Sequence, residues 1–176
     1  MQLFGLADCN NFYCSCERVF HPDLHNSPVV VLSNNDGCII ARSEESKALG
    51  IKMGEVFYQV KDILEQNNVA VFSSNYNLYG DMSRRVMSLL STYTPHLEIY
   101  SIDEAFLDLS DMGNADQLTT YCQTMVRDIT KGTGIPISLG VAPTKTLAKM
   151  ASKFAKKHKG YKGVCLIDTD EKREKA

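Results

Sequence analysis

No stretch of this chain is long and apolar enough to span a membrane. A helix that crosses a bilayer needs about 20 consecutive apolar residues, and the hydrophobic runs here are much shorter. The N-terminus also lacks the basic segment and the cleavage site of a secretory signal. We therefore expect a cytoplasmic protein with no membrane partner.

The cysteines form no recognisable metal or disulfide framework. Six are present, at positions 9, 14, 16, 38, 122 and 165, with no CxxC pair and no histidine at zinc spacing. Cys14 and Cys16 come closest to a metal motif. Cys16, however, shares a helical spacing with the apolar Phe12 and Val19, so a place in the core is the simpler interpretation. Structural zinc and disulfides are the less favoured alternatives.

The net charge of −2 at pH 7 gives no sign of a nucleic-acid partner. The distribution of charge is more informative, because a local cluster of cations attracts phosphate even when the total charge is slightly negative. The basic residues of one stretch are Lys145, Lys149, Lys153, Lys156, Lys157, His158, Lys159 and Lys162. This stretch is either a phosphate-binding surface or the solvated face of an amphipathic helix.

Two adjacent carboxylates, Asp103 and Glu104, interrupt a pair of apolar strand segments. An ionised carboxylate in apolar surroundings needs a cation or hydrogen bonds, so the pair is either a candidate metal site or a polar hairpin turn. The apolar run from Leu3 to Ala7 ends in a third carboxylate, Asp8. Three carboxylates at strand ends suit two Mg²⁺ ions, which take oxygen ligands and act in pairs on phosphoryl groups.

The remaining pattern predicts short strands separated by amphipathic helices. The expected strands are 3–7, 29–32, 38–41, 69–72, 97–102, 105–109, 137–141 and 164–167. The expected helices are one near residue 12, a short one after an N-cap at Ser43, and others over 56–66, 78–93, 116–131 and the stretch after Pro143. From residue 97 onward, the order of elements is typical of an α+β, ferredoxin-like fold, a mostly antiparallel sheet with helices on one face.

Four motifs carry a resemblance to a known family. They are ADCNNFY at 7–13, PVVVLSNNDGC at 28–38, SIDEA at 101–105 and GVAPTKTLAK at 140–149. In this order and spacing, the chain resembles the Y-family translesion DNA polymerases, most of all the UmuC-like branch. The resemblance implies a palm formed by residues 1–10 and 76–168 and a small inserted α/β fingers subdomain at 11–75. Residues 169–176 would begin a truncated thumb or a linker.

The resemblance implies a DNA polymerase that acts in translesion synthesis, DNA repair and the SOS response to DNA damage. Asp8, Asp103 and Glu104 would be the catalytic carboxylates, and with the backbone carbonyl of Cys9 they would hold two Mg²⁺ ions. Two-metal catalysis works by positioning and charge stabilisation, so no nucleophilic side chain is required. The implied substrates are primer-template DNA and a deoxynucleoside triphosphate. A processivity clamp and an accessory SOS subunit are the further partners that the family's full-length proteins suggest.

Residues at the start of the first helix would bind the nucleotide. Tyr13 falls at the family's steric gate, an aromatic ring beneath the sugar that leaves no room for a 2′-hydroxyl. Phe12 is expected in the core. The backbone N–H groups of Asn10, Asn11 and Phe12 would face the triphosphate, as the N–H groups of helix N-termini do for anions.

Two lysines, Lys47 and Lys156, align with basic phosphate contacts of the family. Many members have a Tyr three residues before an Arg in the fingers helix, whereas this chain has Glu44 before Lys47. Because a carboxylate and a phosphate repel each other, we expect Glu44 to point away. A lysine offers a point charge in place of a bidentate fork, so the triphosphate grip is either looser or shared with Arg42.

Two other functions stay open at this point. A diguanylate-type nucleotidyl cyclase shares the palm-like sheet and the use of two metals, but its GG[DE]EF hairpin is replaced here by SIDEA at 101–105. A fragment or regulatory module that binds nucleotide or protein without extending DNA is the other candidate. The family's thumb and little finger, which hold most of the DNA, have no counterpart in this chain, so we expect it alone to be inactive or very weak.

Overall fold

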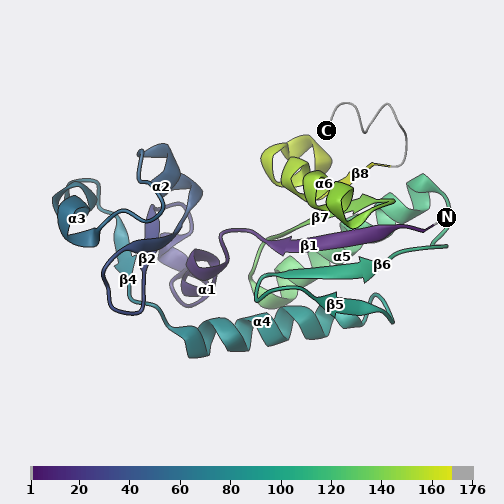
Figure 1. Ribbon diagram of the computed structural model, residues 1–176, viewed down its shortest axis with the longest axis horizontal. Helices are drawn as coiled ribbons and strands as arrows, with labels where there is room; N and C mark the ends of the chain where they lie inside the picture. The colour runs from purple at the N-terminus through teal and green to yellow at the C-terminus, as the bar shows by residue number, and fades with distance from the viewer. Residues whose placement is uncertain (1, 168–176) are drawn as a thin grey trace. The chain divides into compact units, whose positions relative to one another are not determined.

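The computed structural model describes residues 2–167 and divides the chain into two compact units (Figure 1). One unit, the five-stranded unit, comprises the residues up to Asn10 and those from Met82 onward, and its strand order is β5-β6-β1-β7-β8. The other, the three-stranded unit, spans Asn11–Asp81 with strand order β3-β2-β4. Within the part of the chain that is described, no helix is both long and apolar enough to cross a membrane.

The five-stranded unit has a mostly antiparallel sheet, as predicted. Its strands are β1 (Phe4–Cys9), β5 (Leu97–Ile99), β6 (Glu104–Asp108), β7 (Ile137–Ala142) and β8 (Val164–Leu166). Its helices are α5 (Ala115–Thr133), α6 (Lys145–Lys157) and the short η2 (Lys159–Tyr161), and α4 (Tyr76–Ser91) contains the boundary between the units. All neighbouring strands are antiparallel except β7 and β8. The α+β class predicted from the order of elements is confirmed.

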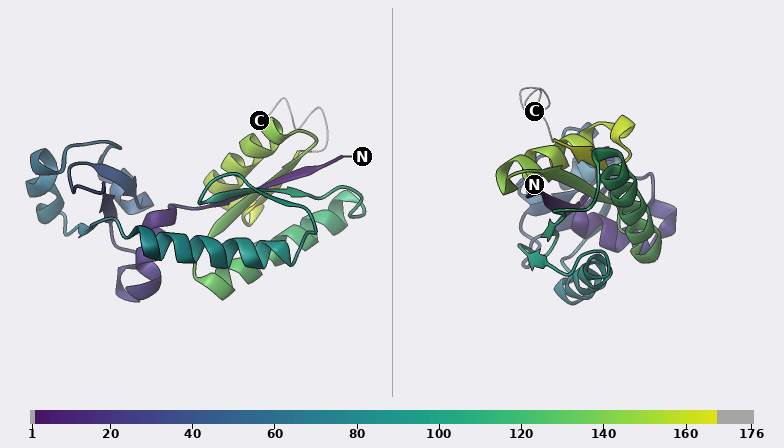
Figure 2. Two further views of the ribbon diagram at one scale, coloured as in Figure 1. Left: turned by 60° about the horizontal axis from the view of Figure 1, so that its bottom comes forward. Right: turned by 90° about the vertical axis from the view of Figure 1, so that its right-hand side faces the viewer.

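Helices cover both faces of this sheet (Figure 2). α6 packs on the face that carries Leu6 and Phe106. α4 and α5 contact each other, since the Tyr121 hydroxyl donates a hydrogen bond to the carbonyl oxygen of Tyr93 just after α4, and α5 also contacts β7 and β8. The prediction that the helices lie on one face is therefore wrong, because α6, which was itself predicted after Pro143, packs on the face opposite α5.

The contact between α6 and β7 depends on the absence of a side chain at Gly140. A Cβ atom at this position would lie 2.1 Å from the backbone nitrogen of Ser152 and 2.2 Å from the carbonyl oxygen of Ala148. Both are backbone atoms, so the whole helix would have to move. The buried residues that α6 contributes to this interface are Ala148, Ala151 and Ala155, and the larger Leu147 and Phe154 pack against them. Met150 is 37% exposed.

Helix α5 runs further than its sequence predicted. The sequence predicted a helix over 116–131, whereas α5 continues to Thr133 and ends at Gly134, whose φ of 77° is the left-handed value that favours glycine. Gly132 fits inside the helix where α5 meets α4, since a Cβ there would lie only 3.3 Å from Leu89. At the other end, Asn114 caps the helix by accepting a hydrogen bond from the Gln117 N–H.

The three-stranded unit has its own core. Its elements are α1 (Phe12–Phe20), η1 (Pro22–Leu24), β2 (Val29–Leu32), β3 (Ile39–Arg42), α2 (Glu44–Ala48), α3 (Phe57–Gln66) and β4 (Ala70–Phe72). Residues of its core are Val30, Leu32, Ile39, Ile51, Leu64 and Val69. Ser43 caps α2 as predicted, because its hydroxyl accepts a hydrogen bond from the Ser46 N–H. Phe20, the last residue of α1, is 59% exposed.

The cysteines are free thiols, most of them buried. Cys14, Cys16 and Cys122 are fully inaccessible, and burial raises the pKa of each of these thiols to about 12. A thiol with such a pKa stays protonated and unreactive at neutral pH. The core interpretation of Cys16 is confirmed.

Replacing Gly140 with alanine is expected to lower the free energy of unfolding by about 3 kcal/mol or more, because overpacking against backbone cannot be relieved by a side-chain rotation. Urea denaturation followed by circular dichroism measures the change. Gly160→Ala is the matched control, since a Cβ at Gly160 would meet nothing within 4 Å. Equal stability of the two variants would show that α6 does not lie as close to β7 as described.

Candidate active site

Three carboxylates converge at one end of the five-stranded sheet. Asp8, Asp103 and Glu104 each offer a carboxylate oxygen, and these oxygens all lie within 4.8 Å of one another. Magnesium binds oxygen at about 2.1 Å, so two ligands of one ion are separated by no more than about 4.2 Å. Small side-chain movements would therefore bring the three carboxylates onto shared divalent cations.

The strand register explains why Asp8 and Glu104 meet. β1 and β6 are antiparallel, and Asp8 lies directly opposite Glu104. Side chains of opposed residues point to the same face of a sheet. Leu6, two residues before Asp8, and Phe106, two residues after Glu104, belong to the core beneath α6. Because side chains alternate along a strand, the two carboxylates lie on the face that α6 covers.

Asp103 reaches the same place from the turn between β5 and β6. The N–H groups of Tyr100 and Ser101 both donate to the carbonyl oxygen of Glu104, at 3.0 and 3.1 Å. The Ser101 hydroxyl donates to Asp103 Oδ1 at 2.9 Å. The Cys9 N–H donates to the carbonyl oxygen of Asp103 at 2.8 Å, which ties the turn to the end of β1.

The environment of Asp8 raises its pKa to about 6. Desolvation by burial is the largest cause, and the nearby charge of Asp103 adds to it. Lys156 acts in the opposite direction, followed by smaller contributions from Glu104, which raises the pKa, and Lys149, which lowers it. Ionisation of Asp8 at neutral pH therefore lowers the stability of the folded state, and a bound divalent cation would offset this loss of stability.

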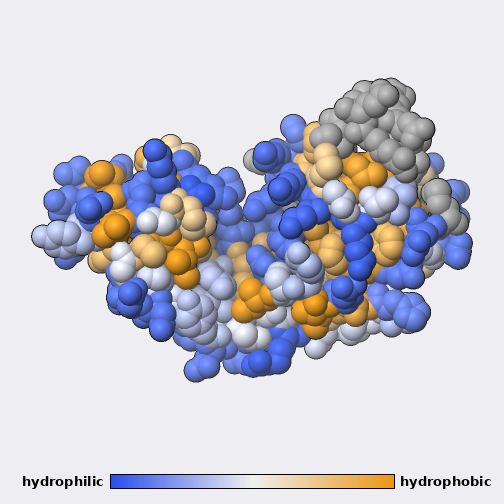
Figure 3. Space-filling view, viewed as in Figure 1, coloured by the Kyte–Doolittle hydropathy of each residue, from blue (hydrophilic) through white to orange (hydrophobic). Residues whose placement is uncertain are grey.

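Two lysines of α6, Lys145 and Lys149, contact an acidic residue and aromatic rings. Lys145 forms an ion pair with Glu98 at 2.7 Å and lies 5.2 Å from the centre of the Phe106 ring, while Lys149 lies 5.6 Å from that of Tyr100. Hydrophilic side chains gather over α6 in Figure 3. Exposed ion pairs are worth roughly 0–1 kcal/mol, so these lysines can exchange their present contacts for phosphate.

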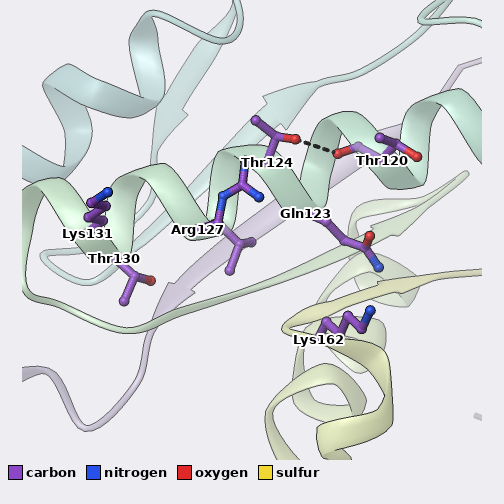
Figure 4. A pocket seen from close by; sticks show the side chains of 8 residues that line it. Thr120, Gln123, Thr124, Arg127, Thr130, Lys131 and Lys162 are labelled. Atoms are coloured by element: carbon purple, nitrogen blue, oxygen red, sulfur yellow. Dashed lines mark hydrogen bonds between the residues drawn. The ribbon is translucent and has the colours of Figure 1, made fainter.

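A groove along α5, with a volume of about 570 Å³, is lined by further basic side chains (Figure 4). Arg127 and Lys131 line it from α5, and Lys162 faces them from the turn before β8. The other lining residues are Thr120, Gln123, Thr124, Val126 and Thr130. Lys162 belongs to the predicted lysine stretch, but none of the lining residues is a carboxylate, so the groove is separate from the three carboxylates.

Lys47, the predicted phosphate contact in the three-stranded unit, pairs with Glu44 and Asn11 in this structure. Lys47 Nζ lies 3.0 Å from Glu44 Oε1 and donates to Asn11 Oδ1 at 3.1 Å. Asn11 Nδ2 in turn donates to Glu44 Oε1 at 3.3 Å. Glu44 was expected to point away from a bound phosphate, and in this structure it pairs with Lys47, because a spacing of three residues on α2 brings the two opposite charges together.

The start of α1 differs in part from the prediction. Asn11 precedes the helix in the left-handed conformation, with φ 46° and ψ 54°, which asparagine tolerates. Phe12 is 5% exposed, as expected of a core residue. The Asn10 N–H was expected to face a triphosphate, but it donates to the carbonyl oxygen of Pro136 at 2.8 Å.

Tyr13 is half-buried and packs against a second tyrosine, Tyr79, which was not among the residues predicted for the site. Its ring stacks on that of Tyr79, with centroids 4.5 Å apart and planes inclined by 17°. Tyr79 is fully buried and donates a hydrogen bond to Glu17. The sequence held one signal for this group, because Glu17 follows Tyr13 by four residues, one helical turn, and so lies on the same face of the helix.

Replacing Asp8 with asparagine is expected to stabilise the metal-free protein at pH 7.5. The folded-state pKa of about 6 exceeds the ordinary value, so the folded state binds more protons than the unfolded state between roughly pH 4 and 6, and its stability falls as pH rises through that window. The variant avoids this loss, which amounts to about 1–3 kcal/mol.

Urea denaturation in the presence of a chelator at pH 4 and pH 7.5 measures this difference. Asp108→Asn is the control, because Asp108 is exposed and its hydrogen bonds to Ser110 lower its pKa. It should give no gain at pH 7.5. If Asp8→Asn gave none either, burial and repulsion at Asp8 would be weaker than described.

Known proteins share both the sequence and the fold of this chain. A family model described as the impB/mucB/samB family matches residues 7–153. ImpB of Salmonella typhimurium is 46% identical over 170 residues, which cover 97% of this chain and 40% of that protein. UmuC of Salmonella typhimurium is 52% identical over 155 residues, which cover 88% of this chain and 37% of that protein.

A solved structure titled "Insertion ternary complex of Dbh DNA polymerase" matches with a TM-score of 0.84 at 25% identity, and the match covers 97% of this chain and 49% of that one. The chain thus spans about two fifths of the length of the curated relatives and half of the solved polymerase. The family model matches most of the chain. The chain therefore belongs to the impB/mucB/samB family of Y-family DNA polymerases.

Proposed function

We propose that this chain is the palm and fingers portion of a template-directed DNA polymerase that carries out nucleotidyl transfer in translesion synthesis. The observation that carries the proposal is the convergence of Asp8, Asp103 and Glu104 at one end of the sheet. In this proposal the five-stranded unit corresponds to the palm and the three-stranded unit to the fingers. Membership of the family supports the same reaction class.

The three carboxylates and the carbonyl of Cys9 would hold two Mg²⁺ ions. When bound, such ions stabilise charge on the attacking and leaving oxygens of a phosphoryl displacement. In that displacement the primer 3′-oxygen forms a bond to the α-phosphorus, and the bond to pyrophosphate breaks. The chain itself contributes positioning: the strand register fixes Asp8 against Glu104, and the Cys9 hydrogen bond fixes the turn that carries Asp103.

The nucleotide-binding roles follow the family pattern. Lys156 and Lys47 would bind the triphosphate, the N–H groups of Asn11 and Phe12 would face it, and Tyr13 would lie beneath the sugar. Primer-template DNA is the proposed second substrate. We extend the proposal to a processivity clamp and an accessory SOS subunit as partners of the full-length protein, and to the cytoplasm as its location.

A second candidate function is a nucleotide-binding module that does not extend DNA. The chain matches 40% of ImpB and 37% of UmuC, so the comparisons leave the extension of DNA by this chain to be tested. Much of the affinity of a protein for DNA comes from many phosphate contacts. The surfaces that supply them in the relatives can lie in the part that this chain does not match.

Single-nucleotide insertion on a primer-template with Mg²⁺ separates the two functions. We expect slow, template-directed insertion that Asp103→Asn reduces at least ~100-fold, because positioning of the reactants is lost. Asp62→Asn, an exposed carboxylate on α3, is the control and should not change the rate. An unchanged rate in Asp103→Asn would contradict the polymerase assignment. Binding of the nucleotide without any insertion by the unaltered chain would favour the second function.

Replacing Glu44 with glutamine is expected to lower the KM for the deoxynucleoside triphosphate. The change frees Lys47 from its ion pair, and an exposed pair worth 0.2–1 kcal/mol corresponds to a change of up to about fivefold. Glu45→Gln is the control, because Glu45 pairs with Arg18 at 2.9 Å. A higher KM in Glu44→Gln would mean that Glu44 orients Lys47 and does not compete with phosphate.

A further inference from the structure

A buried carboxylate lies behind Tyr13 and has no part in the proposed chemistry. Glu17, on α1, is 7% exposed and accepts a hydrogen bond from the Tyr79 hydroxyl at 2.8 Å. Burying a carboxylate is costly unless hydrogen bonds satisfy it, and a leucine of similar size would pack there at lower cost. The presence of Glu17 therefore points to a role beyond filling the core.

Tyr79 connects Glu17 to Tyr13. Its side chain is fully buried, and its ring stacks on that of Tyr13 at 4.5 Å. Burial raises the pKa of the Tyr79 hydroxyl, and the hydrogen bond to Glu17 raises it further. The hydroxyl therefore stays protonated and donates to Glu17 at neutral pH. Tyr76 meets both rings edge-on, with its centroid 6.3 Å from Tyr13 and 6.2 Å from Tyr79.

The two contacts of Tyr79 constrain its ring in different ways. Tyr13 and Glu17 are four residues apart on α1 and so lie on one face of the helix. Stacking alone sets the distance between the rings but leaves them free to slide over each other, because dispersion attraction has little directionality. The hydrogen bond at the hydroxyl end removes that freedom, since its strength depends steeply on distance and angle.

We propose that Glu17 is a positioning residue for sugar selection: through Tyr79 it fixes the ring of Tyr13 where that ring excludes a 2′-hydroxyl. The inference rests on the proposed function, in which Tyr13 contacts the sugar of the incoming nucleotide. The selected substrates are deoxynucleoside triphosphates, and the rejected ones are ribonucleoside triphosphates. A ribose differs by one oxygen atom, so a ring that can slide or tilt leaves room for it, and selection requires a ring held within about 0.5 Å.

If Glu17 had only a structural role, its replacement would affect nucleotide insertion in a different way. Loss of core stability would lower the insertion of both kinds of nucleotide by the same factor. A positioning role changes their ratio. The decisive quantity is therefore kcat/KM for a deoxynucleotide divided by kcat/KM for the matching ribonucleotide, measured on one primer-template.

The test compares Tyr79→Phe, Glu17→Gln and Tyr13→Ala. Tyr79→Phe keeps the stacked ring and loses only the hydroxyl, and we expect it to lower the ratio about tenfold, equivalent to ~1.4 kcal/mol. Glu17→Gln, which keeps an acceptor but loses the charge, should have a smaller effect. Tyr13→Ala should have the largest, and adding Tyr79→Phe to it should lower the ratio no further, because both changes act on the same ring.

Tyr121→Phe is the matched control. It also removes a phenol hydrogen bond, from Tyr121 to the carbonyl oxygen of Tyr93 at 2.6 Å, but in the five-stranded unit. Its ratio should match that of the unaltered protein. A lower ratio in Tyr13→Ala together with an unchanged ratio in Tyr79→Phe would overturn the role of Glu17 and leave Tyr13 as the gate. An unchanged ratio in Tyr13→Ala would overturn both assignments, while loss of insertion in Asp103→Asn would still support the polymerase.

A second readout needs no catalysis. In the 176-residue chain labelled with 3-fluorotyrosine, the ¹⁹F resonance of Tyr13 is identified by its disappearance in Tyr13→Phe. We expect this resonance to shift and broaden in Glu17→Gln and to stay unchanged in Tyr121→Phe. An unchanged resonance in Glu17→Gln would show that the ring of Tyr13 is held without Glu17, and the proposal would fail.

Discussion

Mutual repulsion among Asp8, Asp103 and Glu104 is the constraint on which the arrangement of the five-stranded unit depends. Their oxygens lie within 4.8 Å of one another, and like charges directly opposite in a sheet destabilise it. The backbone holds them together regardless, through the register of β1 and β6 and the hydrogen bond from Cys9 to the turn. The raised pKa of Asp8 expresses the resulting cost. A site that stores repulsion in this way gains stability when a divalent cation binds.

Close packing of α6 supplies part of the compensation. Because Gly140 has no side chain, the backbone of α6 approaches β7 directly, and Lys149 and Lys156 then lie near enough to lower the pKa of Asp8. The close approach of α6 at Gly140 therefore helps to determine how strongly the lysines of α6 lower the pKa of Asp8. The same helix carries the lysine that the proposed function assigns to the triphosphate.

Much of the fold and the convergence of the carboxylates could be predicted from the sequence, because apolar runs that end abruptly in Asp8 or surround Asp103 mark strand ends. Features decided by tertiary contacts could not. The inward face of α6 is set by Gly140 on β7, and Glu44 pairs with Lys47, a contact that the sequence analysis did not predict. Glu17 was missed because a charged residue on a helix, here beside Arg18, resembles a surface residue, and the sequence does not show that Tyr79 packs against it.

The most direct test of the account is diffraction from crystals of the chain soaked with Mn²⁺, with anomalous scattering used to locate the metal. The account predicts manganese at about 2.1–2.2 Å from oxygens of Asp8, Asp103 and Glu104, together with loss of these peaks in crystals of Asp103→Asn. Manganese bound only elsewhere, or no peak at the three carboxylates at saturating concentration, would contradict the central claim that this cluster is a divalent metal site.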